Sequence, residues 1–241
     1  MTRVVKKHAV RRSELLDVAQ RLVYTKGYEQ MTVQEILDAL QIAKGTFFHY
    51  FSSKQALLEA LIERMLEEAS RMLAPIVNDP AMPALEKLQR FFEATVRWKT
   101  EQKSFFLALL RVWYADENAL ARQKVTAAGF ARFTPMLTVI LRQGFQEGVF
   151  TTNYPELASE VVLSLMLGLG DSYSRTLLSF DLDGGDVEHL QGIVGAYTEA
   201  LERTLGAPRG SIALIDEETI REWALPERPA PMEEEQHSAT N

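Results

Sequence analysis

The chain has 241 residues, enough for one or two domains, and 46% of them are hydrophobic, which is ample for a buried core. It contains no cysteine, which excludes disulfides and thiolate metal sites and agrees with a reducing cytoplasm. The cations near the N-terminus precede no apolar stretch, and the most apolar run, near residues 161–169, is short and interrupted. We therefore expect neither a signal peptide nor a membrane span.

Charge is distributed unevenly along the chain. The formal net charge is −7, yet residues 1–54 contain nine Lys and Arg against five Asp and Glu, a net charge of +4. Residues 55–241 carry the compensating excess of acid, a net charge of −11. This asymmetry predicts that the N-terminal end meets a polyanion while the remainder keeps the protein in solution.

The first predicted helix follows a polar arm. We expect residues 1–10 to be mobile, and apolar residues at helical spacing predict a helix over 11–26. Gly27 suits the end of this helix, because glycine readily adopts the positive φ that a helix C-terminus requires.

Residues 32–54 read TVQEILDALQIAKGTFFHYFSSK and contain two short helical patterns around a break. The first helix, predicted over 32–40, begins at Thr32, a good N-cap, and Glu35 completes a capping box. The second is predicted over 44–51. A helix, a tight turn and a second helix carrying cations and hydrogen-bond donors form the helix-turn-helix arrangement, whose second helix fits the major groove of DNA.

This segment resembles the DNA-binding end of the TetR family of bacterial transcriptional regulators. The positions that carry the resemblance are Thr32, Gly45, Thr46, Phe47, Phe48, His49, Tyr50, Phe51 and Lys54. The family often has tyrosine where this chain has Phe48, which removes a hydrogen bond from a phenol to phosphate.

Eight residues of the segment are our candidates for DNA contact: Thr32, Lys44, Gly45, Thr46, Phe48, His49, Tyr50 and Lys54. Thr32 at a helix N-terminus and Lys54 at the start of the next helix suit phosphate, whereas Lys44 suits guanine O6 and N7. The alternative is an ordinary helix pair within a core, a role that Phe47 and Phe51 fill in either case.

Five cations near the N-terminus form a second candidate for DNA contact. They are Arg3, Lys6, Lys7, Arg11 and Arg12, which could lie near the minor groove or the phosphate backbone. A solvated, frayed terminus is the alternative, and the sequence leaves both open.

The chain after the motif is predicted to be helical throughout. Ser52 or Ser53 is expected to cap a long helix over 54–73, and the prolines at 75, 80 and 83 mark the domain boundary. Further helices are predicted at 84–101, 103–115, 117–147, 155–180 and 186–206, with Gly148 closing the third and Pro155 opening the fourth. A short helix over 211–225 would dock on the body, and the Pro- and Glu-rich residues 226–241 are predicted to be disordered.

We therefore predict an all-α fold with an N-terminal three-helix helix-turn-helix DNA-binding domain and a C-terminal helical ligand-binding and dimerisation domain. The expected divisions are a DNA-binding domain at 1–54, a connecting helix at 55–74, the second domain at 75–206 and a C-terminal extension at 207–241. The segment containing Gly144, Gly148, Val149, Phe150, Pro155 and Ala158 also resembles the ligand domain of the TetR family.

The second domain is rich in aromatic residues, most of which we assign to its core. The resemblance implies an inducer pocket in this domain, lined in part by aromatics and methionines. The candidates are Trp98, Phe106, Trp113, Tyr114, Phe133, Met166 and Tyr173.

The last two long helices carry apolar stripes and several glycines. The stripes are Leu157, Val161, Leu165 and Leu169, followed by Val187, Leu190, Val194, Tyr197 and Leu201. The resemblance implies that these helices pair with their mates across a two-fold axis, and packing within one chain is the alternative. Reading a palindrome requires two recognition helices, so we expect a homodimer.

Motifs typical of enzymes do not occur in this sequence. The four histidines are scattered, and neither a Gly-rich phosphate loop nor Gly-x-Ser-x-Gly appears, so we expect no catalytic residue, metal or cofactor. We predict a cytoplasmic repressor that a small lipophilic or aromatic effector releases from a palindromic double-stranded operator. The alternatives are a small-molecule carrier without specific DNA binding, a nucleoid-type DNA binder without a ligand, and a transcriptional activator of the same fold.

Overall fold

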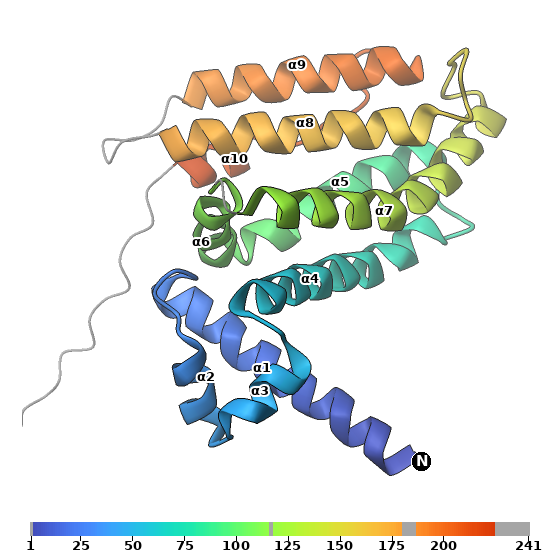
Figure 1. Cartoon of the computed structure of the whole chain (residues 1–241). Helices are drawn as coiled ribbons and strands as arrows, with labels where there is room; N and C mark the ends of the chain where they lie inside the picture. The colour runs from blue at the N-terminus through green and yellow to red at the C-terminus, as the bar shows by residue number, and fades with distance from the viewer. Residues whose placement is uncertain (1, 116–117, 180–186, 225–241) are drawn as a thin grey trace, which may run out of the picture.

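A computed structural model describes residues 2–115, 118–179 and 187–224. Within these ranges the chain forms ten α-helices and no β-strand, as predicted (Figure 1). The helices are α1 (Thr2–Lys26), α2 (Val33–Leu40), α3 (Lys44–Tyr50), α4 (Lys54–Val77), α5 (Ala84–Thr100), α6 (Lys103–Trp113), α7 (Ala119–Glu147), α8 (Ala158–Ser179), α9 (Val187–Leu205) and α10 (Glu217–Ala224). The predicted disorder of 226–241 lies outside the described residues.

Several helix ends follow from local chemistry, as the sequence predicts. Gly27 and Gly148 adopt φ values of +83° and +72° at the ends of α1 and α7. The Ser53 hydroxyl accepts a hydrogen bond from the Ala56 N–H at the start of α4, which identifies Ser53 rather than Ser52 as the cap.

Three predicted boundaries are wrong. Residues 2–10 are part of α1 and do not form an irregular arm. The fourth helix continues through Pro75 to Val77, because this proline lies in the last turn, where the loss of one N–H donor is tolerated and Asn78 still donates to the Ala74 carbonyl. Pro155 lies before α8, which begins at Ala158 after a turn that Leu157 closes by donating to the Tyr154 carbonyl.

Two hydrophobic clusters hold the helices together. The first joins α1, α2 and α3 to the first half of α4, through Leu57 to Met65, and to α6, through Phe105, Leu109 and Val112. The second contains the end of α4 together with α5, α7, α8, α9 and α10. Helix α4 therefore belongs to both clusters and connects the lower and upper parts of the molecule in Figure 1.

Gly144 and Phe150, which are part of the segment that resembles the TetR ligand domain, pack against each other where the chain turns from α7 toward α8. Phe150 is 2% exposed, and its ring lies directly over Gly144, where a Cβ would be only 2.0 Å from a ring carbon. A side chain at position 144 would thus displace the aromatic ring that closes this end of the second cluster.

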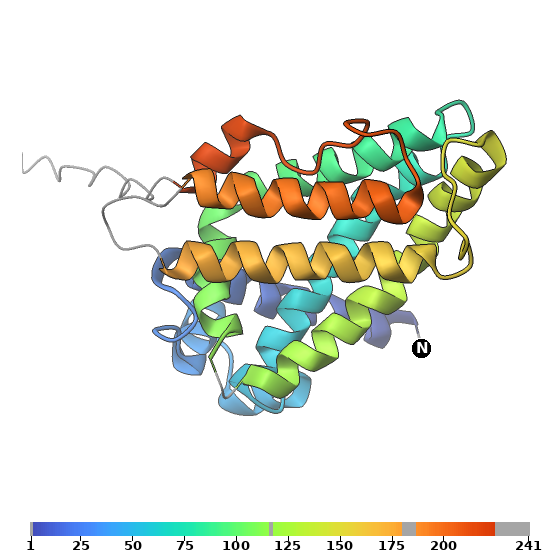
Figure 2. The same cartoon turned by 90° about the horizontal axis from the view of Figure 1, so that it is seen from above.

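The C-terminal extension docks on the body, as predicted. Ile212, Leu214 and Ile220 are buried in the second cluster, and α10 occupies Glu217–Ala224 (Figure 2). The Trp223 indole N–H donates to the Thr100 hydroxyl at 2.8 Å, which attaches α10 to the end of α5. In the described ranges no helix combines the length and the apolar character needed to cross a membrane.

Candidate functional site

Helix α3 is held in place by two buried phenylalanines. Phe47 is fully buried and Phe51 is 3% exposed, and both pack in the first cluster. The turn before α3 places Gln41 in the left-handed region at φ +52°, and the Ile42 N–H donates to the Leu37 carbonyl at 3.0 Å. The fixed backbone and the buried pair determine which face of α3 remains open.

That open face carries most of the predicted DNA residues. Lys44, Gly45, Phe48 and His49 are exposed, whereas Thr46 and Tyr50 are half-buried. No atom lies within 4 Å of the position a Cβ would take on Gly45, so another molecule could approach the backbone there. The Lys44 ammonium is 5.9 Å from the centre of the exposed Phe48 ring. These side chains form a short polar and aromatic surface with a cation at one end.

The structure adds His8, which sequence reasoning missed. Its ring centre lies 4.5 Å from that of Tyr50 and 5.6 Å from that of His49. The spacing of His8 within α1 gave no indication of this contact, because it depends on how α1 crosses α3. His8 therefore belongs to the same surface as the residues of α3.

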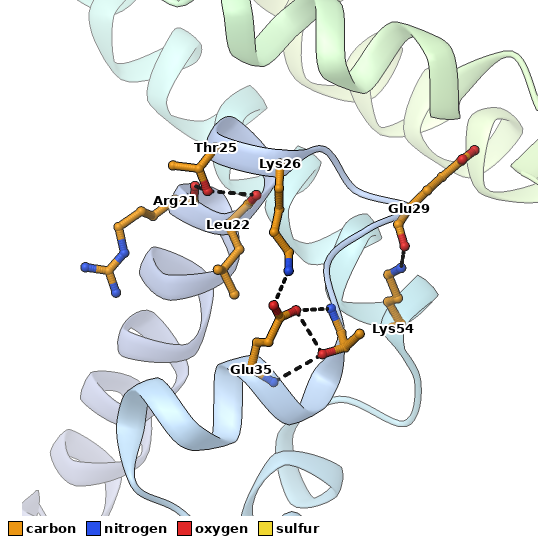
Figure 3. A network of polar contacts seen from close by, with 8 residues as sticks. Arg21, Leu22, Thr25, Lys26, Glu29, Glu35 and Lys54 are labelled. Atoms are coloured by element: carbon orange, nitrogen blue, oxygen red, sulfur yellow. Dashed lines mark hydrogen bonds and ion pairs between the residues drawn. The ribbon is translucent and has the colours of Figure 1, made fainter. Parts of the chain in front are cut away.

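Thr32 is capped as predicted, and its polar groups are occupied. Its hydroxyl accepts from the Glu35 N–H at 3.3 Å and donates to the Glu35 carboxylate at 2.9 Å, while its own N–H donates to that carboxylate at 2.8 Å. The other carboxylate oxygen accepts from Lys26 (Figure 3). A phosphate at this helix N-terminus would compete with Glu35, so a phosphate role for Thr32 stays a prediction.

Lys54 is likewise engaged within the chain. Its ammonium donates to the Glu29 carbonyl at 3.1 Å, as Figure 3 shows, and lies 4.4 Å from the centre of the Tyr28 ring. Burial lowers the pKa of Lys54, and burial also raises the pKa of Tyr28 to about 12. Lys54 thus fixes the loop between α1 and α2, and its contact with phosphate stays a prediction.

Glu35 provides a test of this local network by pH. The hydrogen bond from Lys26, followed by those from Thr32, lowers the Glu35 pKa from 4.5 to about 2. A carboxyl whose pKa is depressed on folding stabilises the folded state above its unfolded pKa, and this contribution is lost as pH falls toward the folded value. We therefore expect the wild type to lose stability between about pH 5 and pH 2 more steeply than Glu35→Gln, measured by thermal unfolding.

Glu67→Gln is a matched control, since Glu67 is an exposed carboxylate on α4. If the wild type, Glu35→Gln and Glu67→Gln all lose stability in the same way as pH falls, the Glu35 network contributes nothing to the stability of the folded state.

The predicted ligand residues divide between the two hydrophobic clusters, and their role in one effector pocket stays a prediction. Phe106 and Trp113 of α6 pack in the first cluster, with the DNA-binding helices, because α6 lies against α1. Trp98 of α5 joins this cluster, with its ring centre 5.4 Å from that of Phe106. Phe133, Met166 and Tyr173 belong to the second cluster. Tyr114 is half-buried and donates to Asp171 at 2.8 Å, and the Asp171 carboxylate also pairs with Arg175.

An open groove lies along the first half of α7. It has a volume of about 660 Å³ and is lined by Ala119, Arg122, Gln123, Thr126, Ala127 and Phe130. Phe130 also packs against the second cluster, where the Tyr173 phenol is buried with no hydrogen-bond partner in the described structure. Phe130 of the groove and Tyr173 of α8 thus belong to the same hydrophobic cluster.

Ion pairs connect α7 to the DNA-binding helices through α4. Lys124 and Arg132 of α7 pair with Glu59 and Glu63 of α4. The next residue of α4, Arg64, pairs with Asp17 of α1 and also bonds the Gln20 amide oxygen and the Leu16 carbonyl. Adjacent residues of α4, Glu63 and Arg64, thus contact α7 on one side and α1 on the other.

Helices α8 and α9 lie side by side along one face (Figure 2). The predicted stripe on α9 faces inward, because Leu190, Val194 and Leu201 are buried in the second cluster, and Leu169 of α8 is buried as well. The Gly168 backbone meets Tyr197, whose hydroxyl would be 2.9 Å from an added Cβ. For these positions packing within the chain explains the pattern.

Other residues of α8, and Leu157 just before it, are exposed to solvent. The apolar ones are Leu157, Val161, Leu167 and Leu178, which are 53%, 42%, 39% and 37% exposed. Gly192 and Gly195 of α9 are exposed too, with nothing within 4 Å of an added Cβ. Contacts within the chain therefore do not account for two glycines inside a helix, where each costs about 1 kcal/mol relative to alanine.

Sequence comparisons identify the two parts of this architecture. Residues 15–61 match the family described as bacterial regulatory proteins of the tetR family, and residues 112–184 match a tetracyclin repressor-like C-terminal domain. The repressor KstR2 of Mycobacterium tuberculosis is 28% identical over 172 residues, which cover 67% of this chain and 78% of that protein. The regulator EthR of Mycolicibacterium smegmatis is 30% identical over 127 residues, covering 46% of this chain and 58% of that protein.

Solved structures share the fold. A TetR regulator from Haloarcula marismortui superposes with a TM-score of 0.62 at 20% identity, covering 82% of this chain and 99% of that one. RolR without ligand gives a TM-score of 0.56 at 20% identity, covering 89% and 98%. The helix-turn-helix and the sequence relatives define a DNA-binding transcriptional regulator, not an enzyme. The chain belongs to the TetR family.

Proposed function

We propose that this regulator is a repressor that binds a palindromic operator as a homodimer and is released by a small, largely apolar effector. The observation that carries the proposal is the open face of α3, which presents Lys44 and Gly45 outward while Phe47 anchors the helix. The charge of residues 1–54, net +4, supports a polyanionic partner at this end. We propose that the protein acts in the cytoplasm, where its DNA target lies.

The proposed dimer uses the outer face of α8 and α9. Exposed Leu157 and Val161 would be buried against the partner, and Gly192 and Gly195 would let the partner's helix approach closely. Two α3 helices related by a two-fold axis then meet successive major grooves of a palindrome.

The proposed effector site is the α7 groove and the side chains beneath it. Of the predicted ligand residues we retain Phe133, Met166 and Tyr173, which share the second cluster with Phe130 of the groove. We also retain Tyr114 at its edge, where Arg122 of the groove lies 5.9 Å from the Tyr114 ring centre. The mostly apolar lining suits a small apolar molecule, with the Tyr173 hydroxyl as a donor to it.

Release requires the effector to favour one conformation over another. A ligand that bound a shifted α7 more tightly would move Glu63 through Arg132, and Arg64 beside it would carry the change to α1. A coupling of about 1–3 kcal/mol would lower operator affinity roughly 5- to 150-fold.

The domain limits also remain a proposal. We keep the DNA-binding domain at 1–54, the connecting helix at 55–74, the ligand-binding domain at 75–206 and the extension at 207–241. The division is one of function, since residues 57–65 of α4 pack with the DNA-binding helices.

The test combines an effector screen with a variant of the α4–α7 connection. Apolar compounds that raise the thermal unfolding midpoint would be titrated into complexes of the protein with fluorescent operator DNA. We expect such a compound to release the DNA, and we expect Arg132→Met to bind the compound equally well but to release less DNA. An exposed ion pair contributes little to stability, so the unfolding midpoint of the variant should change little.

Arg90→Met is the matched control, because Arg90 is an exposed arginine paired with Glu86 on α5, outside this connection. Compounds that bind without altering operator affinity would contradict release by an effector. Strengthened binding to a promoter in the presence of the compound would favour an activator, and compound binding without specific DNA binding would favour a carrier.

A further inference from the structure

Helix α1 contacts the surface of α3 through a histidine. Figure 1 shows the N-terminal half of α1 passing α3. The side chains of residues 2–7 lie outside the described part of the structure, so both alternatives for the cations in this segment stay open. His8 is the first described side chain of α1, and it is exposed. Its ring centre lies 4.5 Å from that of Tyr50, with an angle of 44° between the ring planes, so the two rings pack together.

His8 and His49 form a pair of imidazoles on this surface. Their ring centres are 5.6 Å apart, and the ring of Tyr50 contacts both, with its centre 4.5 Å from that of His8 and 5.1 Å from that of His49. His49 is exposed as well, and it belongs to the open face of α3 together with Lys44 and Phe48. The pair thus joins a side chain of α1 to the face that we propose for DNA.

Acidic side chains are missing from the two described segments that form this pair. The ring contacts of both histidines lie within α1 and α3, and residues 8–13 and 44–50 contain no Asp or Glu. Their other ionisable side chains are Arg11, Arg12, Lys44 and Tyr50. Glu14, the next acidic residue along α1, pairs with Arg11 at 2.7 Å. Among the described residues, neither imidazole takes part in a hydrogen bond or an ion pair. A counter-charge for a protonated histidine therefore has to come from outside these segments.

Phosphate supplies such a counter-charge in a DNA complex. Histidine titrates near pH 6.5 in model peptides, and both ring nitrogens of its protonated form are donors. A phosphate oxygen that accepts from an imidazole N–H lies about 4 Å from the ring centre, so two rings 5.6 Å apart are close enough to contact one phosphate group. The pair therefore has the spacing of a phosphate contact that strengthens when the rings are protonated.

We propose that His8 joins His49 in a contact with the DNA backbone, and that this contact makes binding tighter as the pH falls. The proposal rests on operator binding by α3, and it adds a residue of α1 that sequence reasoning missed. DNA phosphate favours the protonated imidazoles, so the complex takes up protons that the free protein does not hold. Affinity is then highest at acid pH, falls as pH rises through the range in which the histidines lose their protons, and is level above that range.

The test compares the pH dependence of DNA binding in His8→Phe and in the wild type. Phenylalanine keeps an aromatic ring against Tyr50 but cannot be protonated. Operator and random duplexes would be titrated at constant ionic strength between about pH 5.5 and about pH 7.5. An exposed ion pair changes affinity by roughly two- to fivefold, so loss of His8 from both protomers should reduce the gain in affinity on acidification by roughly 4- to 25-fold. The reduction should be the same on both duplexes, because phosphate contacts do not read base sequence.

Proton uptake is a second readout, which packing alone does not change. Isothermal titration in buffers with different ionisation enthalpies measures how many protons are bound together with the DNA. His8→Phe should lower this number by up to about one for each protomer, and His49→Phe should lower it similarly. His189→Gln is the matched control, because His189 is exposed on α9, and this variant should take up as many protons as the wild type.

An unchanged gain on acidification in His8→Phe, with intact operator binding, would overturn the proposal and leave the proposed function standing. The proposal also fails if His8→Ala loses affinity equally at both pH values while His8→Phe binds like the wild type, because His8 would then only pack against Tyr50. If the wild type does not prefer operator to random DNA at any pH, the proposed function fails as well.

Discussion

Replacing Lys44 with alanine is expected to weaken binding to the operator far more than binding to random DNA. Lys44 is exposed at the first position of α3, where its ammonium can reach guanine O6 and N7 in the major groove. Loss of a base contact costs about 1–3 kcal/mol in each half-site, and a dimer repeats the contact, so the total is about 2–6 kcal/mol. Fluorescence anisotropy with labelled operator and random duplexes measures both losses.

Arg90→Ala is the control for this experiment, because it also removes one exposed cation per protomer but lies on α5. Its operator affinity should match that of the wild type. Equal fractional losses on operator and random DNA for Lys44→Ala would show that Lys44 meets phosphate and does not read a base.

Replacing Val161 with glutamate is expected to separate the dimer. Val161 is 42% exposed on the outer face of α8, so a charge there disturbs little within the chain but would be buried in the proposed interface. Each monomer would then bind one half-site without the effective concentration that linkage provides, a loss of about 10²- to 10⁴-fold in operator affinity. Sedimentation velocity and operator titration measure the two consequences.

Leu120→Glu is the matched control, since Leu120 is 61% exposed on α7 and lies outside the α8–α9 face. It should remain dimeric and bind the operator like the wild type. A Val161→Glu protein that stays dimeric would show that the interface lies elsewhere, and a monomer with full operator affinity would contradict the need for two linked recognition helices.

Local chemistry explains why much of the helix-turn-helix unit is predictable. The capping box of Thr32 and Glu35 and the positive φ of Gly27 each depend on residues close in sequence. The position of Phe47 in the core follows from the spacing of the motif. The face of α3 left open to solvent is then fixed by these short-range constraints.

Contacts between distant segments account for what the sequence does not predict. Lys26 reaches Glu35, and Lys54 reaches the Glu29 carbonyl, only because α1, α2 and α4 converge. Helical spacing predicts that Trp98 lies on the apolar face of its helix, but it does not predict which hydrophobic cluster Trp98 joins. Trp98 of α5 belongs to the first cluster because its ring meets that of Phe106 on α6, and α6 packs against α1.

The helix ends that differ from prediction share a physical cause. In the sequence, Pro75 predicts the end of a helix. A proline in the last turn removes a single hydrogen bond, however, and the burial of Leu73 and Val77 in the second cluster favours continuing the helix. At the N-terminus, His8 of α1 packs against Tyr50 of α3, a contact between helices that the amino-acid composition does not predict.

The most direct test is a titration of the purified protein against labelled DNA from upstream of its own gene, at two salt concentrations and with excess random-sequence competitor. We expect tight binding that survives the competitor and weakens with salt in a graded way, because base contacts by α3 add to phosphate contacts. Binding that disappears on addition of competitor or modest salt would contradict specific recognition of this DNA by α3.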